Sequence, residues 1–229
     1  MKAILIGYGE IGQAVKEVFS NFHDIDVVKK EGDEIPGQSY DLMLVAIPYT
    51  DKFVEIMEDY KSKVNVNSIV VFSSVQIGTC SQIGAIHSPI EGLHPHLVES
   101  LKNCRRWVGG SDELVNKFFA ESKLSCRQFE KPEITEALKL SSTALYGLNI
   151  LFANYRKKIA DDLDFDFSNF KAYDKDYNNL YQSLCMPQYQ RYLLDPPEGE
   201  IGGHCIVPNA KILMKKYPSV FLDRIIKQK

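Results

Sequence analysis

One glycine-rich turn near the N-terminus constrains the fold of this chain more than any other feature. Residues 2–6 form a short apolar run, the turn GYGEIG follows at 7–12, and a helical pattern comes directly after it. A strand before and a helix after are the context in which G-x-G-x-x-G indicates dinucleotide binding. Gly7 allows the tight turn, Gly9 lets the backbone approach a pyrophosphate, and Gly12 lets the helix pack close to the strand. The alternative is a glycine-rich turn that binds no ligand.

The end of the second predicted strand, at 25–29, bears on which dinucleotide is bound. It carries Lys29 and Lys30 at the place where an Asp or Glu commonly holds the ribose hydroxyls. Two lysines would tolerate a 2′-phosphate and could hold one, so NADP is predicted beside NAD. The alternative is that both lysines are solvated and that Glu31 or Asp33 holds the ribose from a shifted register. The predicted cofactor contacts are Gly7, Gly9, Glu10, Ile11, Gly12, Lys29, Pro48 and Ser74.

Strand and helix patterns alternate through the first 130 residues. Buried-strand patterns lie at 40–48 and 68–74, shorter strand patterns at 84–87 and 105–109, and helical patterns at 51–61 and 111–123. Strands that alternate with helices indicate a doubly wound parallel sheet of the α/β class. Residues 1–130 are therefore predicted to form a Rossmann-type dinucleotide-binding domain.

Residues 131–229 are predicted to form a helical domain built on one long helix at 132–163, with further helices at 168–184, 209–216 and 219–227. Pro132 suits the first helical position, and apolar residues then recur three, four or seven apart, the period of one helical face. At about 1.5 Å per residue the helix would be roughly 45 Å long. Its middle is apolar nearly all round, so it must be covered on more than one side. We therefore expect it to join two domains or two subunits, and predict a homodimer through this helix.

Composition narrows the classes of function. The 229 residues carry a formal net charge of -3 with a pI near 6.0, which argues against nucleic acid or an anionic membrane as the main partner. The sequence shows no charge-free apolar run long enough for a membrane span, and it begins with a strand pattern rather than a signal peptide. Its five cysteines have no paired spacing, which predicts reduced thiols in a cytoplasmic protein.

Five motifs in order resemble those of the UDP-glucose/GDP-mannose dehydrogenase family. They are GYGEIG at 7–12, SSVQIGT at 73–79, SPIEG at 88–92 followed by VGG at 108–110, EALKL at 136–140 and GGHCI at 202–206. With His before Cys, the last motif is most similar to that of the members that oxidise UDP-N-acetylhexosamines. The resemblance covers nearly the whole chain but only about the first two-thirds of the family's architecture. The family's separate C-terminal domain, which holds the nucleotide of the sugar, has no counterpart here.

The resemblance implies a small-molecule substrate, a sugar or nucleotide sugar, and a four-electron oxidation in two steps. A primary alcohol loses a hydride to become an aldehyde, a cysteine thiolate adds to it, a second hydride leaves, and water hydrolyses the thioester. By the same resemblance Cys205 would be the nucleophile, Lys139 would stabilise the oxyanion, and Glu91 would manage water or protons.

Two positions depart from the family's pattern and keep other functions open. Thr143 stands where the family has Asn, and Asn209 stands where it has Asp. Because Asn cannot take a proton from water, hydrolysis of the thioester would need another base. The first alternative is a two-electron dehydrogenase of a hydroxy acid or polyol in which Lys139 acts and Cys205 does not. The second is a non-catalytic dinucleotide-binding protein.

Three histidines lie close together in the sequence and could form a metal site. His94 and His96 flank a proline, and His87 lies nearby, so their imidazoles could bind zinc. No cysteine or acidic residue has a matching spacing, and the segment corresponds to a substrate loop in the family that the chain resembles. No metal is therefore predicted.

Overall fold

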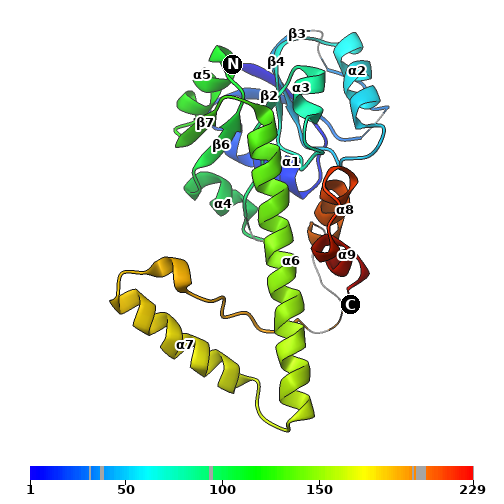
Figure 1. Ribbon diagram of the computed structural model, residues 1–229. Coiled ribbons are helices and arrows are strands. Elements are labelled where there is room, and N and C mark those ends of the chain that lie inside the picture. The colour runs from blue at the N-terminus through cyan, green and yellow to red at the C-terminus, as the bar shows by residue number, and fades with distance from the viewer. Residues whose placement is uncertain (31, 37–38, 93–94, 198, 200–204, 229) are drawn as a thin grey trace. The chain divides into compact units, whose positions relative to one another are not determined.

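The computed structural model describes residues 1–30, 32–36, 39–92, 95–197, 199 and 205–228 (Figure 1). Contacts divide the chain into two compact units, Met1–Lys139 and Leu140–Lys229. The boundary falls inside the long helix α6 (Pro132–Asp162), which confirms the helix predicted at 132–163 and ends one residue before its expected end. The first turns of α6 therefore belong to the first unit.

The first unit is built on a seven-stranded sheet with the order β2-β1-β3-β4-β5-β6-β7. The strands are β1 (Lys2–Ile6), β2 (Asp24–Val28), β3 (Ser39–Val45), β4 (Asn65–Val71), β5 (Ile86–His87), β6 (Arg106–Gly109) and β7 (Cys126–Phe129). Strands β1 to β5 run parallel, as predicted. The sheet departs from parallel pairing at one step, where β6 pairs antiparallel with β5 and parallel with β7.

Helices cover both faces of this sheet, which confirms the predicted doubly wound α/β class. They are α1 (Glu10–Phe19), α2 (Phe53–Lys63), α3 (Thr79–Ile83), α4 (Leu97–Asn103) and α5 (Glu113–Glu121). Side chains alternate along each strand, so Ala3 and Leu5 join one core with residues of α1, α4 and α5. Ile4 and Ile6 join the other core with residues of α2 and α3. Burial on both faces explains why the strands read as nearly unbroken apolar runs.

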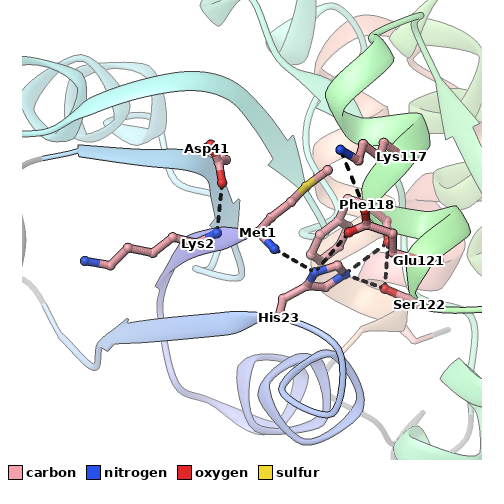
Figure 2. A network of polar contacts seen from close by, with 8 residues as sticks. All are labelled: Met1, Lys2, His23, Asp41, Lys117, Phe118, Glu121 and Ser122. Atoms are coloured by element: carbon pink, nitrogen blue, oxygen red, sulfur yellow. Dashed lines mark hydrogen bonds and ion pairs between the residues drawn. The ribbon is translucent and has the colours of Figure 1, made fainter.

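A buried histidine fastens α5 to the start of β2 (Figure 2). The ring of His23 stacks on Phe118 with 4.3 Å between centroids, and its Nε2 lies 2.9 Å from Ser122 Oγ. The Glu121 carboxylate lies 3.7 Å from Nδ1. Burial lowers the pKa of His23. This ring serves packing between α5 and the start of β2.

The second unit contains the rest of α6, then α7 (Ser168–Ser183), a 3-10 turn η1 (Pro187–Tyr189), α8 (Ile206–Lys216) and α9 (Val220–Lys227). Its apolar core gathers residues of α6, α8 and α9, namely Ala144, Ile150, Ile206, Ala210, Leu222 and Ile225. The helix predicted to begin at 209 begins three residues earlier, at Ile206. The reason is that Ile206 is itself a core residue and continues the apolar face of α8 toward the N-terminus.

An ionic cluster joins α6 and α7 to the extended segment after η1. The Asp174 carboxylate is 1% exposed and pairs with Arg156 through Oδ2 and, at 3.1 Å, with Arg191 through Oδ1. The Arg191 guanidinium also lies 3.5 Å from the ring centroid of Tyr177. Both carboxylate oxygens are therefore satisfied, which is the condition for burying a charge.

The apolar middle of α6 is covered only in part. Phe152 is 60% exposed and Tyr155 is 59% exposed, with 6.3 Å between their ring centroids. Among the helices of the described ranges, none combines the length and apolar character that a bilayer crossing requires. The homodimer predicted from this helix stays a prediction, and these two rings are where it is best tested.

Candidate functional site

The predicted cofactor and catalytic residues of the first unit gather at one edge of the sheet. Strands β1, β3, β4 and β5 run parallel, so the loops that follow them meet at the carboxyl edge. The strand order places β2 and β3 on opposite sides of β1, which makes a topological switch point there, the usual ligand position in such sheets. Exposed Pro48 follows β3, half-buried Ser74 follows β4, and Glu91 follows β5.

Packing explains two glycines of the turn at 7–12 and leaves the third without a structural reason. Gly7 has φ +94°, and a Cβ there would lie 2.5 Å from the Ala46 carbonyl oxygen. A Cβ on Gly12 would lie 2.2 Å from the Gly7 carbonyl oxygen, so α1 could not start so close to β1. A Cβ on Gly9 would meet nothing within 4 Å. The chain itself does not require glycine at position 9, whereas a pyrophosphate placed against the turn would, so the residues fit a dinucleotide.

The start of α1 is suited to an anion. Gly9 is the N-cap residue and has no side chain to cap the first turn. The side chain of Glu10 is exposed, while that of Ile11 packs against the core, so Ile11 can offer a ligand only its backbone. Backbone N–H groups at the N-terminus of a ten-residue helix point outward and carry its positive dipole end.

Lys29 lies beside the same turn. Its Nζ is 5.7 Å from the centroid of the Tyr8 ring, which brings a cation to the glycine-rich segment. The Asp33 carboxylate accepts a hydrogen bond from the Lys30 backbone N–H at 3.1 Å and so closes a local turn. Glu31 lies outside the described residues. The contact of Lys29 with Tyr8 is consistent with the alternative in which the lysines lie near the ribose. In the other alternative Asp33 would hold the ribose, but its carboxylate already accepts a hydrogen bond from the backbone of its own turn.

Lys139 and Glu91, predicted from separate motifs, lie together. The Lys139 Nζ donates to the Ile90 carbonyl oxygen at 2.7 Å and to Glu91 Oε2 at 3.3 Å. The Lys139 side chain is 15% exposed and that of Glu91 is 42% exposed. The pair therefore combines a largely buried cation with a carboxylate that water can reach, and a charge-assisted bond joins them.

Glu136, three residues before Lys139, has a role that the sequence motifs did not reveal. Its fully buried carboxylate accepts from the Gly78 N–H at 2.6 Å and from the Cys80 N–H at 2.9 Å. Burial raises the pKa of Glu136, and these two backbone hydrogen bonds oppose that shift. The SSVQIGT motif at 73–79 is thereby tied to α6 one turn before Lys139. The sequence signal that could have indicated this role is an acidic residue on the buried face of a predicted helix.

Both ring nitrogens of His87 have hydrogen-bond partners within the protein, which link β5 to the segment after β4 and to α6. Its Nε2 donates to the Ser73 carbonyl oxygen at 3.1 Å, and Nδ1 lies 2.8 Å from Thr135 Oγ1. Burial lowers the pKa of His87 to about 4, so the ring is neutral. No cluster of three or more metal-binding side chains occurs among the described residues, and His94 lies outside them.

The second unit brings together the two residues that depart from the family's pattern. The Asn209 Nδ2 donates to Thr143 Oγ1 at 3.2 Å, and Asn209 is 3% exposed. Cys205 is exposed at the N-cap position of α8, where its carbonyl accepts the Asn209 N–H at 2.9 Å. The rest of the motif at 202–206, up to His204, lies outside the described residues.

No protein-family model matches the sequence, and a search of curated proteins gives no match. Solved structures do match. The UDP-D-ManNAc dehydrogenase of Pyrococcus horikoshii has a TM-score of 0.76 at 13% identity, over 100% of this chain and 68% of that one. The UDP-glucose dehydrogenase of Pyrobaculum islandicum has a TM-score of 0.70 at 14% identity, over 99% and 68%. The 3-hydroxyisobutyrate dehydrogenase of Mycobacterium tuberculosis has a TM-score of 0.71 at 8% identity, over 99% and 91%.

At these identities the likeness establishes the fold. The match extends over essentially the whole length of this chain. It covers about two-thirds of the two UDP-sugar dehydrogenases and nearly all of the 3-hydroxyisobutyrate dehydrogenase.

Proposed function

We propose that this chain is an NAD(P)-dependent oxidoreductase that oxidises a CH–OH group, with the primary alcohol of a sugar or nucleotide sugar as its substrate. The dehydrogenase fold and the glycine-rich turn at the switch point support the cofactor. The single observation that carries the chemistry is the Lys139 ammonium, held at the same edge of the sheet by the Ile90 carbonyl and the Glu91 carboxylate.

The cofactor is assigned to the turn and the start of α1. Gly7, Gly9 and Gly12 would let its pyrophosphate approach the backbone, and the first N–H groups of α1 would hold the phosphate charge. When bound, NAD or NADP supplies the hydride acceptor. The positive charge of Lys29 beside Tyr8 in the glycine-rich turn supports binding of a 2′-phosphate, so we propose that NADP is accepted as well as NAD.

Lys139 is assigned to the oxygen of the reacting alcohol. An ammonium whose position is fixed by two acceptors can stabilise the negative charge that the substrate oxygen carries once its proton has left and before the hydride is lost. Glu91 Oε2, 3.3 Å from that ammonium and half exposed, can pass a proton between Lys139 and water. The carbon is oxidised by loss of the hydride and of the hydroxyl proton, which gives the aldehyde.

Cys205 is assigned to the second oxidation. Its thiolate would add to the aldehyde carbon, and loss of a second hydride would leave a thioester that water hydrolyses to the acid. Asn209 donates its amide to Thr143 and has no basic site for water, so the hydrolytic base must be another residue.

The same Asn209–Thr143 contact favours a second candidate. If Cys205 takes no part, Lys139 alone would support a two-electron oxidation of a hydroxy acid or polyol. The likeness in fold to a 3-hydroxyisobutyrate dehydrogenase, over 99% of this chain and 91% of that one, also supports this candidate.

Two matched pairs of variants test these roles. Lys139→Met should lower kcat by about 10²- to 10⁴-fold and leave NAD(P)H binding unchanged, because the cation that stabilises the substrate oxyanion is lost but the turn is intact. Lys131→Met, an exposed lysine eight residues earlier, is its control. Cys205→Ser should stop the reaction at the aldehyde, while exposed Cys185→Ser should not. Wild-type kcat in Lys139→Met would remove the proposal, and wild-type acid formation in Cys205→Ser would leave only the two-electron candidate.

A further inference from the structure

A buried arginine lies behind the segment that holds Lys139. Arg106, on β6, is 1% exposed and is among the largest fully buried side chains of the described residues. Its Nη2 donates to the carbonyl oxygens of Pro89 and, at 3.4 Å, Ser88. Its Nε and Nη1 have no hydrogen-bond partner among the described residues. Arginine is almost never fully buried unless it is paired, so this placement requires an explanation.

Stability does not provide that explanation. Burial lowers the pKa of Arg106, and the negative charge of Glu91 acts in the opposite direction. A charge buried without a contacting carboxylate, with two of its nitrogens unsatisfied, costs more free energy than its hydrogen bonds return. An apolar side chain of similar volume would pack in the same space at lower cost. We therefore look for the role of the guanidinium in the two backbone carbonyl groups that it binds.

Its contacts are the two residues that precede the Lys139 partners. Ser88 and Pro89 follow β5 outside any helix or strand, so side chains rather than a backbone ladder must fix their carbonyl groups. The next two residues, Ile90 and Glu91, supply the acceptors of the Lys139 ammonium. Arg106 holds the segment from one side and Lys139 binds it on the other.

The far end of the segment is also fixed by close packing. A Cβ on Gly92 would lie 2.8 Å from Ser100 Cβ, so this end fits tightly against α4. At the start of the segment the Ser88 N–H donates to the Val71 carbonyl oxygen at 2.9 Å, and Arg106 binds the carbonyl oxygens of Ser88 and Pro89. The segment at 88–91 is therefore held at both ends, and Arg106 is the side chain that holds its carbonyl groups.

We propose that Arg106 is a positioning residue, whose buried guanidinium fixes the backbone at 88–91 so that the Ile90 carbonyl and the Glu91 carboxylate hold Lys139 in its working position. This role rests on the proposed function, but its geometry can be tested without a substrate. Lys139, as the group that touches the substrate, is the catalytic residue.

The first test follows the Lys139 amine directly. Competitive labelling with acetic anhydride, read by mass spectrometry, gives the rate of modification of Lys139 relative to exposed Lys131 in the full chain. In Arg106→Met this ratio should rise several-fold because the amine loses its fixed acceptors. In Glu91→Gln it should also rise, because the ammonium loses the negative charge with which it pairs. Arg105→Met, a change at the neighbouring exposed arginine, should leave the ratio unchanged. Arg106→Lys keeps the charge but replaces the planar guanidinium, whose Nη2 binds both carbonyl oxygens, by a shorter side chain that ends in an ammonium, so it should give a smaller rise.

The second test separates positioning from folding. NADPH affinity and thermal unfolding are measured for each variant, and only variants that bind NADPH with wild-type affinity are compared. In those, kcat should fall about tenfold to a hundredfold with KM nearly unchanged, as expected when a catalytic group is misplaced. A folded Arg106→Met or Arg106→Lys protein with the wild-type labelling ratio overturns the role. If wild type binds NADPH but turns nothing over, the labelling result still decides on Arg106, while the proposed function fails separately.

Discussion

The three glycines of the turn allow cofactor binding to be separated from folding, and Gly9→Ala is the decisive change. Gly9 has φ -70° and ψ -168°, a conformation open to alanine, and a Cβ there meets nothing within 4 Å. The free energy of unfolding should therefore change by no more than about 0.5 kcal/mol. The added methyl group would occupy the space in which a pyrophosphate approaches the backbone.

The expected loss of affinity follows from the hydrogen bonds that the methyl group displaces. One hydrogen bond from a backbone N–H to a charged group contributes about 1.5–3 kcal/mol. Because each tenfold change in affinity corresponds to about 1.4 kcal/mol, the Kd for NADH or NADPH should rise about tenfold to a hundredfold. Titration followed by the fluorescence of the reduced nicotinamide measures this directly.

Gly12→Ala should behave in the opposite way. Its Cβ would lie 2.2 Å from a backbone oxygen that cannot move aside without shifting β1 or α1. Overpacking of this kind costs about 1–3 kcal/mol, and Tm should fall by about 2–4 °C for each kcal/mol. Glu17→Ala, on the exposed face of α1, is the control for both variants. If Gly9→Ala bound NADH and NADPH as tightly as wild type, the turn would not be the phosphate site.

Three further predictions concern pH, the second unit and assembly. The pKa of His87 falls from 6.5 to about 4 on folding, so the contribution of the neutral ring to stability is complete above pH 6.5 and should decrease by about 3 kcal/mol as pH falls to about 4. In urea titrations the free energy of unfolding should depend less on pH in His87→Gln than in wild type. The same dependence on pH in both proteins would contradict this prediction. Asp174→Asn should lower the free energy of unfolding, measured in urea, by about 3 kcal/mol, because Arg156 and Arg191 lose a buried counter-charge. A change below about 0.5 kcal/mol would show that the cluster does not stabilise the fold. Wild type should sediment as a dimer and Phe152→Asp as a monomer, because the substitution puts a charge on the exposed apolar face of α6. If the two proteins had the same sedimentation coefficient, this face of α6 would not be a dimer interface.

The parts of the fold that could be predicted from the sequence are those specified by local patterns. The turn at 7–12, the buried strands and α6 each carry their own periodicity or glycine spacing, and the structure confirms them. Boundaries shifted where polar residues extend an element: β4 begins at Asn65 rather than at 68 because Asn65 pairs with Ser39 of β3. Pairing of this kind depends on a partner strand, which the pattern of one segment does not contain.

The features that were missed depend on contacts between distant segments. The seven-residue helix α4 was not predicted, because so short a pattern is indistinguishable from a loop, and the reversed direction of β6 is a property of the sheet rather than of its residues. Arg106 read as a strand residue beside another arginine, and only packing makes it buried. The family resemblance gave Lys139 and Glu91 roles in one reaction, but the contact between them was not predicted, because they lie 48 residues apart and neither segment alone indicates it.

The most direct test of the proposed function is to count reduced cofactor per substrate consumed. Wild type would be incubated with NAD or NADP and a panel of UDP- and GDP-hexoses, N-acetylhexosamines, hydroxy acids and polyols, with absorbance following the cofactor and chromatography following the substrate. Two reduced cofactors per sugar would support the thioester route through Cys205. One would support the two-electron reaction of Lys139. Tight NAD(P)H binding without turnover of any member of the panel would contradict the proposed dehydrogenase activity and favour a non-catalytic dinucleotide-binding protein.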